Sequence, residues 1–403
     1  MRNKVQIVND SVIVENFSEA YPYINKYVLE NGELESSRNG STKEILDFKT
    51  KVSNPYKRCV GNNSRNINVF FLLAESMWIF AGKKDVKTLS IFNEQMKEYS
   101  DDGNSFHAPY GFRMRHYGVS SFDPEIKPSS ENSNHYSNQV NQGIDQLLEN
   151  LMMLSEDSQS RRAVLSIWNP ELDCNKKSKD LPCNDMLMLK IRNNKLISTI
   201  SNRSNDLHWG LPTNIFQFSF FTELISLILG VELGTQTHNS QSLHIYTDND
   251  IALNMYENMQ FNPNFVDLYD ISTPFKLDFN FISPSVQGRL AEIDSILNLI
   301  LDSFTSNEGF RDELFVRINK KSNMFATIYS ICHVYLSYKK QEKNDKNRVC
   351  AIEKLFISGI HTNSESGKPL DIHVLAQNFF LHRIKELDKF GQIEKILFTN
   401  EKL

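Results

Sequence analysis

The feature that most constrains this 403-residue chain is a pair of short apolar runs within residues 186–200, separated by two adjacent asparagines. Apolar runs around an Asn-Asn turn predict an antiparallel β-hairpin. Cys183 precedes the first run and Arg203 follows the second. Because a hairpin returns the chain to the side from which it started, we expect the thiol and the guanidinium to be neighbours. The cation would favour the thiolate, the reactive form of cysteine, although a lone cysteine is more often a small buried apolar residue.

Length and charge limit the classes of fold and partner. Hydrophobic residues make up 40% of the chain and include 27 phenylalanines, so it can bury a sizeable core, as one large domain with a smaller one or as two domains. The 44 basic and 49 acidic residues give a net charge of −5. We therefore expect no nucleic-acid polymer as partner, whereas a single phosphate on a small ligand needs only a few local arginines.

The cysteines and the apolar runs predict where in the cell the protein is located. The five cysteines are widely spaced and form no CxxC pair, which favours free thiols in a reducing compartment over a disulfide framework or a metal site. The N-terminus has no apolar signal segment. The most apolar runs, 67–81 and 215–230, contain Glu75 and Glu223 and are too short to span a bilayer. We expect a cytoplasmic protein without a membrane partner.

Periodicity predicts the order of the elements. The expected helices are 12–31, 67–80, 140–154, 215–229, 324–338 and 372–390, with a further apolar stripe from Leu290 to Phe304. The expected strands are 186–191, 196–200, 242–247 and 275–282, with one that begins at Arg161 and Arg162. Residues 35–42 and 119–139 are expected to be loops.

Three groups of polar residues are candidates for a functional site. Glu75 lies among apolar residues of an expected helix, where its pKa should rise, although helices of large domains also carry solvent-facing glutamates. Arg161 and Arg162 are adjacent at the start of a strand and should point to opposite faces, so both reach one ligand only through a turn or a second subunit. His244 and Tyr246 are two apart in a strand and share a face, a pairing also common in cores.

Several short motifs occur in one order along the chain. They are Arg38-Asn-Gly-Ser-Thr, Glu75-Ser-Met-Trp-Ile-Phe-Ala-Gly, Ala-Pro-Tyr110-Gly, Ser160-Arg161-Arg162, Leu-Pro-Cys183, Asn-Arg203-Ser204-Asn-Asp206, Gly210-Leu-Pro-Thr-Asn214 and Leu-His244-Ile-Tyr246. In this combination the sequence resembles the thymidylate synthase and pyrimidine-nucleotide hydroxymethylase superfamily over roughly residues 12–282.

The resemblance implies a fold and an assembly. It implies an α/β (α+β) bent-sheet fold in a catalytic domain of residues 1–284. Beyond the resemblance, apolar residues at helical spacing predict a helical extension of residues 285–403. The resemblance also implies a homodimer in which Arg161 and Arg162 reach the phosphate bound by the partner subunit. That arrangement would resolve the difficulty of two adjacent arginines serving one ligand.

The resemblance also implies roles for the motif residues, and it makes Cys183 the expected nucleophile rather than a residue of the core. The expected phosphate ligands of the same subunit are Arg38, Arg203 and Ser204. Asn214 would read the pyrimidine edge, and His244 and Tyr246 would hold the sugar hydroxyl. The expected proton-handling residues are Glu75 and Tyr110, and Asp206 corresponds to the catalytic aspartate near the folate pterin.

The implied chemistry explains these residue types. C5 of uracil is a poor nucleophile until a thiolate adds at C6, after which it can attack the methylene of the co-substrate 5,10-methylenetetrahydrofolate, with no metal. Glu75 would organise proton transfer at O4 and C5 through water. An asparagine such as Asn214 can donate to O4 and accept from N3–H, which favours a uridylate, most simply dUMP, over a cytidylate.

Departures from the family pattern bear on the final step. Asn184 replaces the usual histidine, Met96 stands where we align a family tryptophan, and Ser-Leu-His244 resembles the phage hydroxymethylases. The usual short apolar C-terminus, which closes over folate, is replaced by the extension. In this superfamily the reaction ends either with hydride from tetrahydrofolate, which gives a methyl group, or with water, which gives a hydroxymethyl group. Together these departures favour water and hence predict a dUMP hydroxymethyltransferase.

Two alternatives stay open beside hydroxymethylation. One is a thymidylate synthase that makes dTMP and dihydrofolate. The other is an inactive nucleotide-binding or regulatory homologue, against which the joint presence of Cys183, Glu75 and Asn214 argues, because a binding module needs no nucleophile. Ribose and deoxyribose both fit His244 and Tyr246, and the role of the extension and the biological pathway stay open too.

Overall fold

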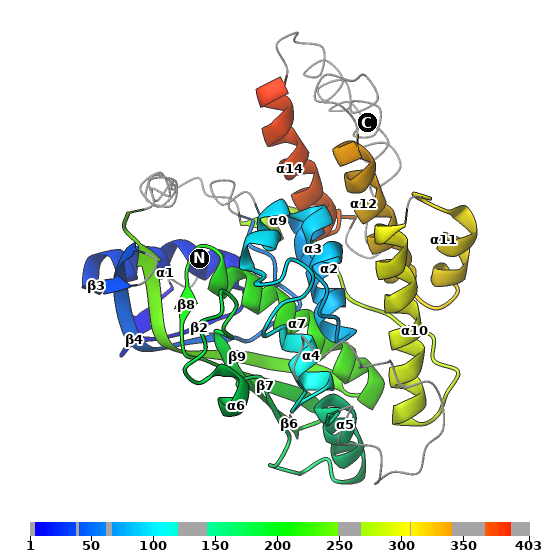
Figure 1. Ribbon diagram of the computed structural model, residues 1–403, viewed down its shortest axis with the longest axis horizontal. Coiled ribbons are helices and arrows are strands. Elements are labelled where there is room, and N and C mark those ends of the chain that lie inside the picture. The colour runs from blue at the N-terminus through cyan, green and yellow to red at the C-terminus, as the bar shows by residue number, and fades with distance from the viewer. Residues whose placement is uncertain are drawn as a thin grey trace.

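The computed structural model describes residues 5–37, 40–61, 67–119, 143–248, 267–306, 308–340 and 367–387. Arg38 and most of the segment 119–139, which we expected to form a loop, lie outside these ranges. Within them the chain forms one mixed sheet and a set of helices packed on it and on one another (Figure 1).

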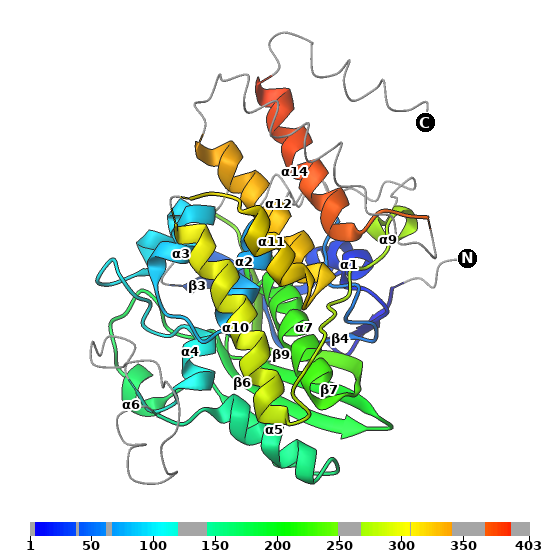
Figure 2. The same ribbon diagram turned by 90° about the vertical axis from the view of Figure 1, so that its right-hand side faces the viewer.

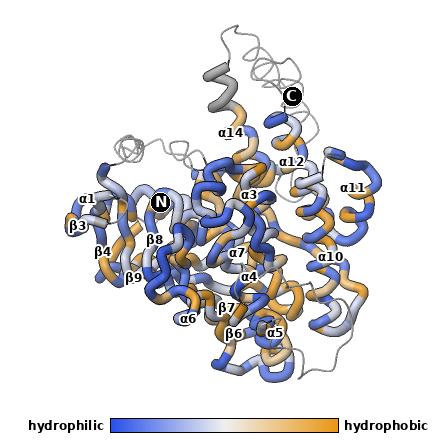
Figure 3. Tube along the Cα trace, in the orientation of Figure 1, coloured by the Kyte–Doolittle hydropathy of each residue, from blue (hydrophilic) through white to orange (hydrophobic). Residues whose placement is uncertain are grey.

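The sheet has nine strands in the described part of the chain, in the spatial order β1-β2-β4-β9-β7-β6-β5. Two short strands lie beside this path, because β3 pairs with β4 and β8 pairs with β9. The strands are β1 (Ile7–Val8), β2 (Ser11–Val14), β3 (Glu33–Ser37), β4 (Gly40–Val52), β5 (Val164–Ser166), β6 (Asn184–Arg192), β7 (Lys195–Asn202), β8 (Asn205–Asp206) and β9 (Glu232–Tyr246). Figure 3 shows hydrophobic stretches on β6 and β7, inside the sheet.

The predicted hairpin is confirmed. β6 and β7 pair antiparallel, and Arg192 opposes Lys195 across the turn. Asn193 and Asn194 have φ angles of 51° and 57°, the left-handed conformation that a two-residue hairpin turn requires and that asparagine tolerates. The open end of the hairpin therefore brings the residue before β6 next to the residue after β7.

Most predicted helices are also confirmed. The helices are α1 (Phe17–Asn31), α2 (Val69–Phe80), α3 (Val86–Phe92), α4 (Tyr110–Arg115), α5 (Gln146–Glu156), α6 (Pro170–Asp173), α7 (Gly210–Leu229), α9 (Leu268–Ile271), α10 (Val286–Thr305), α11 (Asp312–Asn319), α12 (Asn323–Lys340) and α14 (Asp371–Leu387), with a 3₁₀ helix at Glu94–Tyr99. The long helix α7 is buried along nearly its whole length, packs against both α2 and the sheet, and ends at Gly230, whose φ is 70°. None of the helices described here has both the length and the hydropathy needed to cross a membrane.

Three of the C-terminal helices, α10, α12 and α14, pack on α2, and α10 also packs on α3 (Figure 2). The ring of Tyr335 in α12 stacks on Phe70 in α2 at a centroid distance of 4.6 Å. Asn68 caps the N-terminus of α2, and its amide also donates to the Tyr335 hydroxyl at 3.2 Å. The apolar core continues from the sheet through α7 and α2 into these helices.

Three expectations about local structure are wrong. Residues 275–282 form no strand, because the N–H groups of Phe275 and Leu277 donate to the buried carboxylates of Asp371 and Glu223 instead of a neighbouring strand. The segment 35–42 is largely strand, since β3 and β4 pair antiparallel there. The helix expected over 12–31 begins only at Phe17, because β2 occupies the preceding residues and pairs with β4.

Candidate active site

One cavity of about 1880 Å³ opens between the sheet, α2 and α7. Nine of the residues singled out in the sequence line it: Glu75, Tyr110, Cys183, Arg203, Ser204, Asp206, Asn214, His244 and Tyr246. Residues more than 160 positions apart in sequence therefore meet around one space. Arg161 and Arg162 are exposed just before β5 and do not line it. Arg38, the remaining candidate, lies outside the described residues.

Cys183 and Arg203 lie side by side at the open end of the hairpin, as expected. The Arg203 N–H donates to the Cys183 carbonyl at 3.0 Å, and its guanidinium Nη2 lies 3.9 Å from Cys183 Sγ. The Arg203 side chain is oriented by a 2.8 Å bond from Nε to the carbonyl of Pro182. Burial raises the pKa of the Cys183 thiol above its ordinary value, and the charge of Arg203 opposes this without cancelling it. The guanidinium therefore limits the rise in pKa and does not by itself produce a thiolate.

Glu75 projects from α2 into the cavity. Burial raises the pKa of its carboxyl to about 8, and the negative charge of Asp180 adds to the rise. Gln217 of α7 donates a hydrogen bond to Glu75 Oε2, which favours the charged form. A carboxyl group that titrates near neutral pH can both give and take a proton during turnover.

Tyr110 begins α4, and the packing of that helix on α2 depends on the next residue. A Cβ at Gly111 would lie 1.7 Å from the carbonyl oxygen of Ile79, so only glycine permits this approach. The Tyr110 hydroxyl is hydrogen-bonded by the side chain of Asn184 and the backbone of Cys183. Burial raises the pKa of Tyr110 further above its already high ordinary value, so the hydroxyl keeps its proton.

Asn214 is held by other asparagines. Its Oδ1 accepts from Asn184 Nδ2 at 3.1 Å, and its Nδ2 donates to Asn205 Oδ1 at 3.1 Å. All three side chains are buried, with at most 6% of their surface exposed. Each bond uses one hydrogen or one lone pair, so the amide of Asn214 retains one donor and one acceptor for a ligand.

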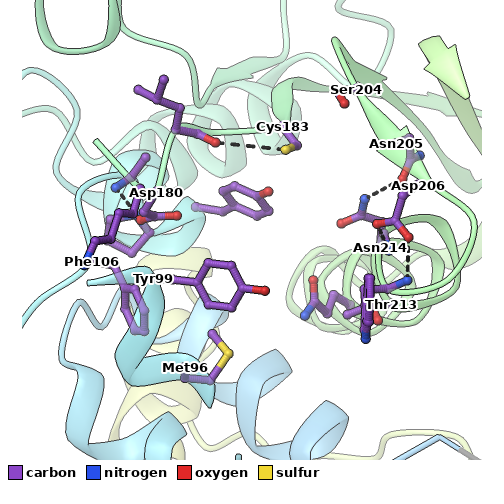
Figure 4. A pocket seen from close by; sticks show the side chains of 18 of the residues that line it. Met96, Tyr99, Phe106, Asp180, Cys183, Ser204, Asn205, Asp206, Thr213 and Asn214 are labelled. Atoms are coloured by element: carbon purple, nitrogen blue, oxygen red, sulfur yellow. Dashed lines mark hydrogen bonds between the residues drawn. The ribbon is translucent and has the colours of Figure 1, made fainter. Parts of the chain in front are cut away.

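Asp206 lies at the N-terminus of α7. Its carboxylate accepts the N–H groups of His208, Trp209 and Gly210 at 2.7 to 2.8 Å, which explains why this helix begins before the predicted Ile215. Figure 4 shows Asp206 and Asn214 on the wall opposite Tyr99. Burial and the charge of Asp206 raise the pKa of the Tyr99 hydroxyl.

His244 and Tyr246 share one face of β9, as predicted, with ring centroids 5.3 Å apart. His244 Nδ1 lies 3.3 Å from the hydroxyl of Ser242, which in turn donates to the carboxylate of Glu44. Ser242 and Glu44 also line the cavity. This end of the cavity therefore presents hydroxyl groups, an imidazole and a carboxylate.

Several cavity residues were not identified from the sequence. Asp180, Gln217, Asn205 and Tyr99 line the cavity and interact with predicted residues, and Glu44 lines it and accepts a hydrogen bond from Ser242. Asp180 stands only three positions before Cys183, and Asn205 lies between Ser204 and Asp206. This proximity to motif residues was the one sequence feature that could have identified Asp180 and Asn205. Nothing in the sequence marked Gln217 or Glu44. No group of three or more acidic, histidine or cysteine side chains in the described ranges is placed to hold a metal ion.

Comparison with known proteins gives matches along this same region. Residues 19–265 match the family model described as thymidylate synthase. A deoxyuridylate hydroxymethyltransferase of Bacillus phage SP01 is 35% identical over 286 residues, 70% of each chain. One of Pseudomonas phage M6 is 33% identical over 236 residues, 58% of this chain and 60% of the relative. The thymidylate synthase of varicella-zoster virus (strain Dumas) is 26% identical over 201 residues, 45% of this chain and 60% of the relative.

Proposed function

This chain belongs to the thymidylate synthase family, and from that membership we propose that it transfers a one-carbon unit to C5 of a uridylate, with dUMP as substrate and a 5-hydroxymethyl nucleotide as product. The observation that carries the proposal is the meeting of Cys183, Glu75 and Asn214 in one cavity. A sulfur nucleophile, a carboxyl group that titrates near neutrality and a base-reading amide are the groups that this reaction needs.

Cys183 starts the reaction by adding to C6 of the pyrimidine. Because its pKa is raised, the thiol still holds its proton and transfers it to a water molecule in the cavity as the carbon–sulfur bond forms. The developing charge on sulfur lies 3.9 Å from the Arg203 guanidinium, which stabilises it. The same guanidinium, together with Ser204, binds the phosphate and so places the ring over the sulfur. Arg38 completes this phosphate site in the proposal.

Glu75 and Tyr110 manage the protons. With a pKa of about 8, the Glu75 carboxyl is largely protonated at neutral pH and can donate towards O4 through water as C6 is attacked. Once ionised, it can help to remove the C5 proton. The Tyr110 hydroxyl accepts from Asn184 and from the Cys183 backbone, so its own proton is available to the substrate.

The bound co-substrate 5,10-methylenetetrahydrofolate would supply the methylene group, and the cavity fits a second ligand. Its volume of about 1880 Å³ exceeds the 300 to 1,000 Å³ that is usual for one small molecule. Beyond the nucleotide groups it is lined by Met96, Tyr99 and Trp78, which offer apolar and aromatic contact to a ring system. The Asp206 carboxylate faces this region and would accept hydrogen bonds from the pterin.

Two observations favour water, rather than hydride from tetrahydrofolate, in the last step of the reaction. The two phage relatives at 35% and 33% identity are named deoxyuridylate hydroxymethyltransferases, whereas the viral thymidylate synthase is 26% identical. Met96 lines the cavity where we align a family tryptophan, which leaves a flexible thioether in place of an indole wall. Water adding to the exocyclic methylene at C5 leaves the carbon as a hydroxymethyl group, and the C6–sulfur bond then breaks, which returns the Cys183 thiolate and releases the product. Thymidylate synthesis is the second candidate, and the viral match favours it.

We extend the proposal to a homodimer in which Arg161 and Arg162 act on the partner subunit's phosphate site. Both arginines are exposed and lie outside the cavity of their own chain. The alternate residues Met186 and Met188 of β6 are only partly buried, and Val164 of β5 is 37% exposed, so one face of the sheet keeps apolar surface that a second copy could cover. We propose that residues 285–403 act as one extension, because its described helices α10, α12 and α14 pack on α2 and would hold Glu75 in place.

Replacing Cys183 with serine tests the proposed nucleophile. We expect Cys183→Ser to bind dUMP with near wild-type affinity, because the phosphate and base contacts remain, while losing turnover by at least three orders of magnitude. Calorimetry and mass spectrometry of the product measure the two effects. Wild-type turnover by Cys183→Ser would refute the mechanism, and a wild-type protein that binds dUMP without product would favour the regulatory alternative.

A further inference from the structure

The asparagine that reads the base belongs to a longer chain of side-chain hydrogen bonds, which we call the amide relay. It consists of Asn202, Asn184, Asn214, Asn205 and Ser240. These residues come from β7, β6, α7, β8 and β9, so five elements of the fold converge on it. All five side chains are buried, and Asn214 is the most exposed at 6%.

The relay runs in one direction. Asn202 donates to Asn184 Oδ1, and Asn184 Nδ2 donates to Asn214 Oδ1 at 3.1 Å. Asn214 Nδ2 donates to Asn205 Oδ1 at 3.1 Å, and Asn205 Nδ2 donates to the Ser240 hydroxyl at 3.1 Å. Asn184, Asn214 and Asn205 therefore each receive a hydrogen bond on the amide oxygen and give one from the nitrogen, whereas Asn202 only donates.

This direction matters because a primary amide can read either pyrimidine. With nitrogen towards O4 and oxygen towards N3–H it matches uracil, and turned by half a rotation it matches the N4 amine and N3 of cytosine. If Asn214 alone turned, its nitrogen would face Asn184 Nδ2 and its oxygen would face Asn205 Oδ1. Both contacts would become repulsive inside a buried site, where unpaired polar groups are costly.

We propose that Asn184 is a positioning residue for base specificity, which holds the Asn214 amide in the orientation that reads uracil. This inference rests on the proposed uridylate substrate and goes beyond it. The residue next to the nucleophile would then set specificity through Asn214, without touching the base itself. Asn205 supports the same orientation from the other side as an acceptor.

Two isosteric substitutions, one on each side of Asn214, test whether its neighbours fix the orientation of its amide. Asn184→Asp places an acceptor where Asn214 now finds a donor, so Asn214 should turn its nitrogen towards Asp and present the cytosine-reading edge. Asn205→Asp keeps an acceptor facing Asn214 Nδ2, and Ser240 can donate to the new carboxylate. Both variants bury one added carboxylate in the same relay, so they are matched controls for charge and packing.

The readout is the ratio of dissociation constants for dUMP and dCMP, measured by calorimetry on the full chain without folate. We expect Asn184→Asp to shift this ratio towards dCMP by roughly 10- to 100-fold, and Asn205→Asp to keep the wild-type preference within about threefold. Asn184→Ala, which adds no charge, should lower the preference by roughly tenfold if the aspartate variant does not fold.

Equal shifts in the two aspartate variants, or an unchanged ratio in Asn184→Ala, would overturn the inference. The wild-type ratio tests the proposed substrate, because a protein that prefers dCMP is not a uridylate enzyme. The difference between Asn184→Asp and Asn205→Asp tests the relay. The two proposals can therefore fail separately.

Discussion

Replacing Glu75 with glutamine should make the protein more stable at alkaline pH while it removes turnover. Burial raises the pKa of this carboxyl from 4.5 to about 8. Between these two values the folded protein binds more protons than the unfolded chain, so the free energy of unfolding falls as the pH rises. The destabilisation caused by ionised Glu75 is absent below about pH 4.5 and complete above about pH 8. Glutamine at this position has no charge to bury and can still accept the hydrogen bond from Gln217.

The magnitude follows from the same numbers. At about 1.4 kcal/mol per pH unit, a pKa that moves from 4.5 to about 8 sets an upper limit of about 5 kcal/mol. Glu75 is only partly buried and faces an open cavity, so water reduces this value. We expect a stabilisation on the order of 2 to 3 kcal/mol at pH 8.5 and little difference at pH 5.

Denaturant unfolding of wild type and Glu75→Gln at both pH values measures this difference. Glu15→Gln is a control of opposite sign, because the ion pair with Lys57 lowers the pKa of the Glu15 carboxyl. That contribution is lost as the pH falls, so Glu15→Gln should lose a little stability at neutral and alkaline pH. An advantage of Glu75→Gln that is the same at pH 5 and pH 8.5 would refute the reasoning, since it could not come from ionisation.

Two further predictions concern the dimer and the extension. An inactive Cys183→Ser protein mixed with an inactive Arg161→Ala/Arg162→Ala protein should recover up to about a quarter of wild-type activity after subunit exchange, because half of the random dimers carry one complete site. No recovery would place these arginines in their own subunit's site, and an arginine double variant that is active alone would place them outside any site. Tyr335→Ala should cost about 3 to 5 kcal/mol in denaturant unfolding and lower turnover, because it removes the stacking on Phe70 of α2. Tyr335→Phe should cost only about 1 kcal/mol, and equal losses in both variants would contradict a packing role.

The parts of the fold that the sequence predicted are those decided by local chemistry. Two asparagines that tolerate a left-handed turn, between alternating apolar residues, were enough to bring Cys183 and Arg203 together. The continuous apolar run of α2 predicted both the helix and the raised pKa of Glu75. In each case residues close in sequence determine the outcome.

The parts that the sequence did not predict depend on distant contacts. Residues 275–282 look like a strand, but two buried carboxylates, Glu223 and Asp371, take the N–H groups that a ladder would use. Gln217 meets Glu75 across 142 positions of sequence, and the bond exists only because α7 packs on α2. Asn184 was recognisable in the sequence because it replaces the usual histidine of the family. Its hydrogen bond to Asn214 was not, because that bond forms only when the hairpin and α7 are both in place.

The most direct test of the central claim is to convert dUMP with 5,10-methylenetetrahydrofolate in water enriched in oxygen-18, with UMP and dCMP in parallel. Mass spectrometry identifies the product, and absorbance follows dihydrofolate. We expect a 5-hydroxymethyl product from dUMP that carries the heavy oxygen, with no dihydrofolate formed. A 5-methyl product that appears in step with dihydrofolate would contradict it.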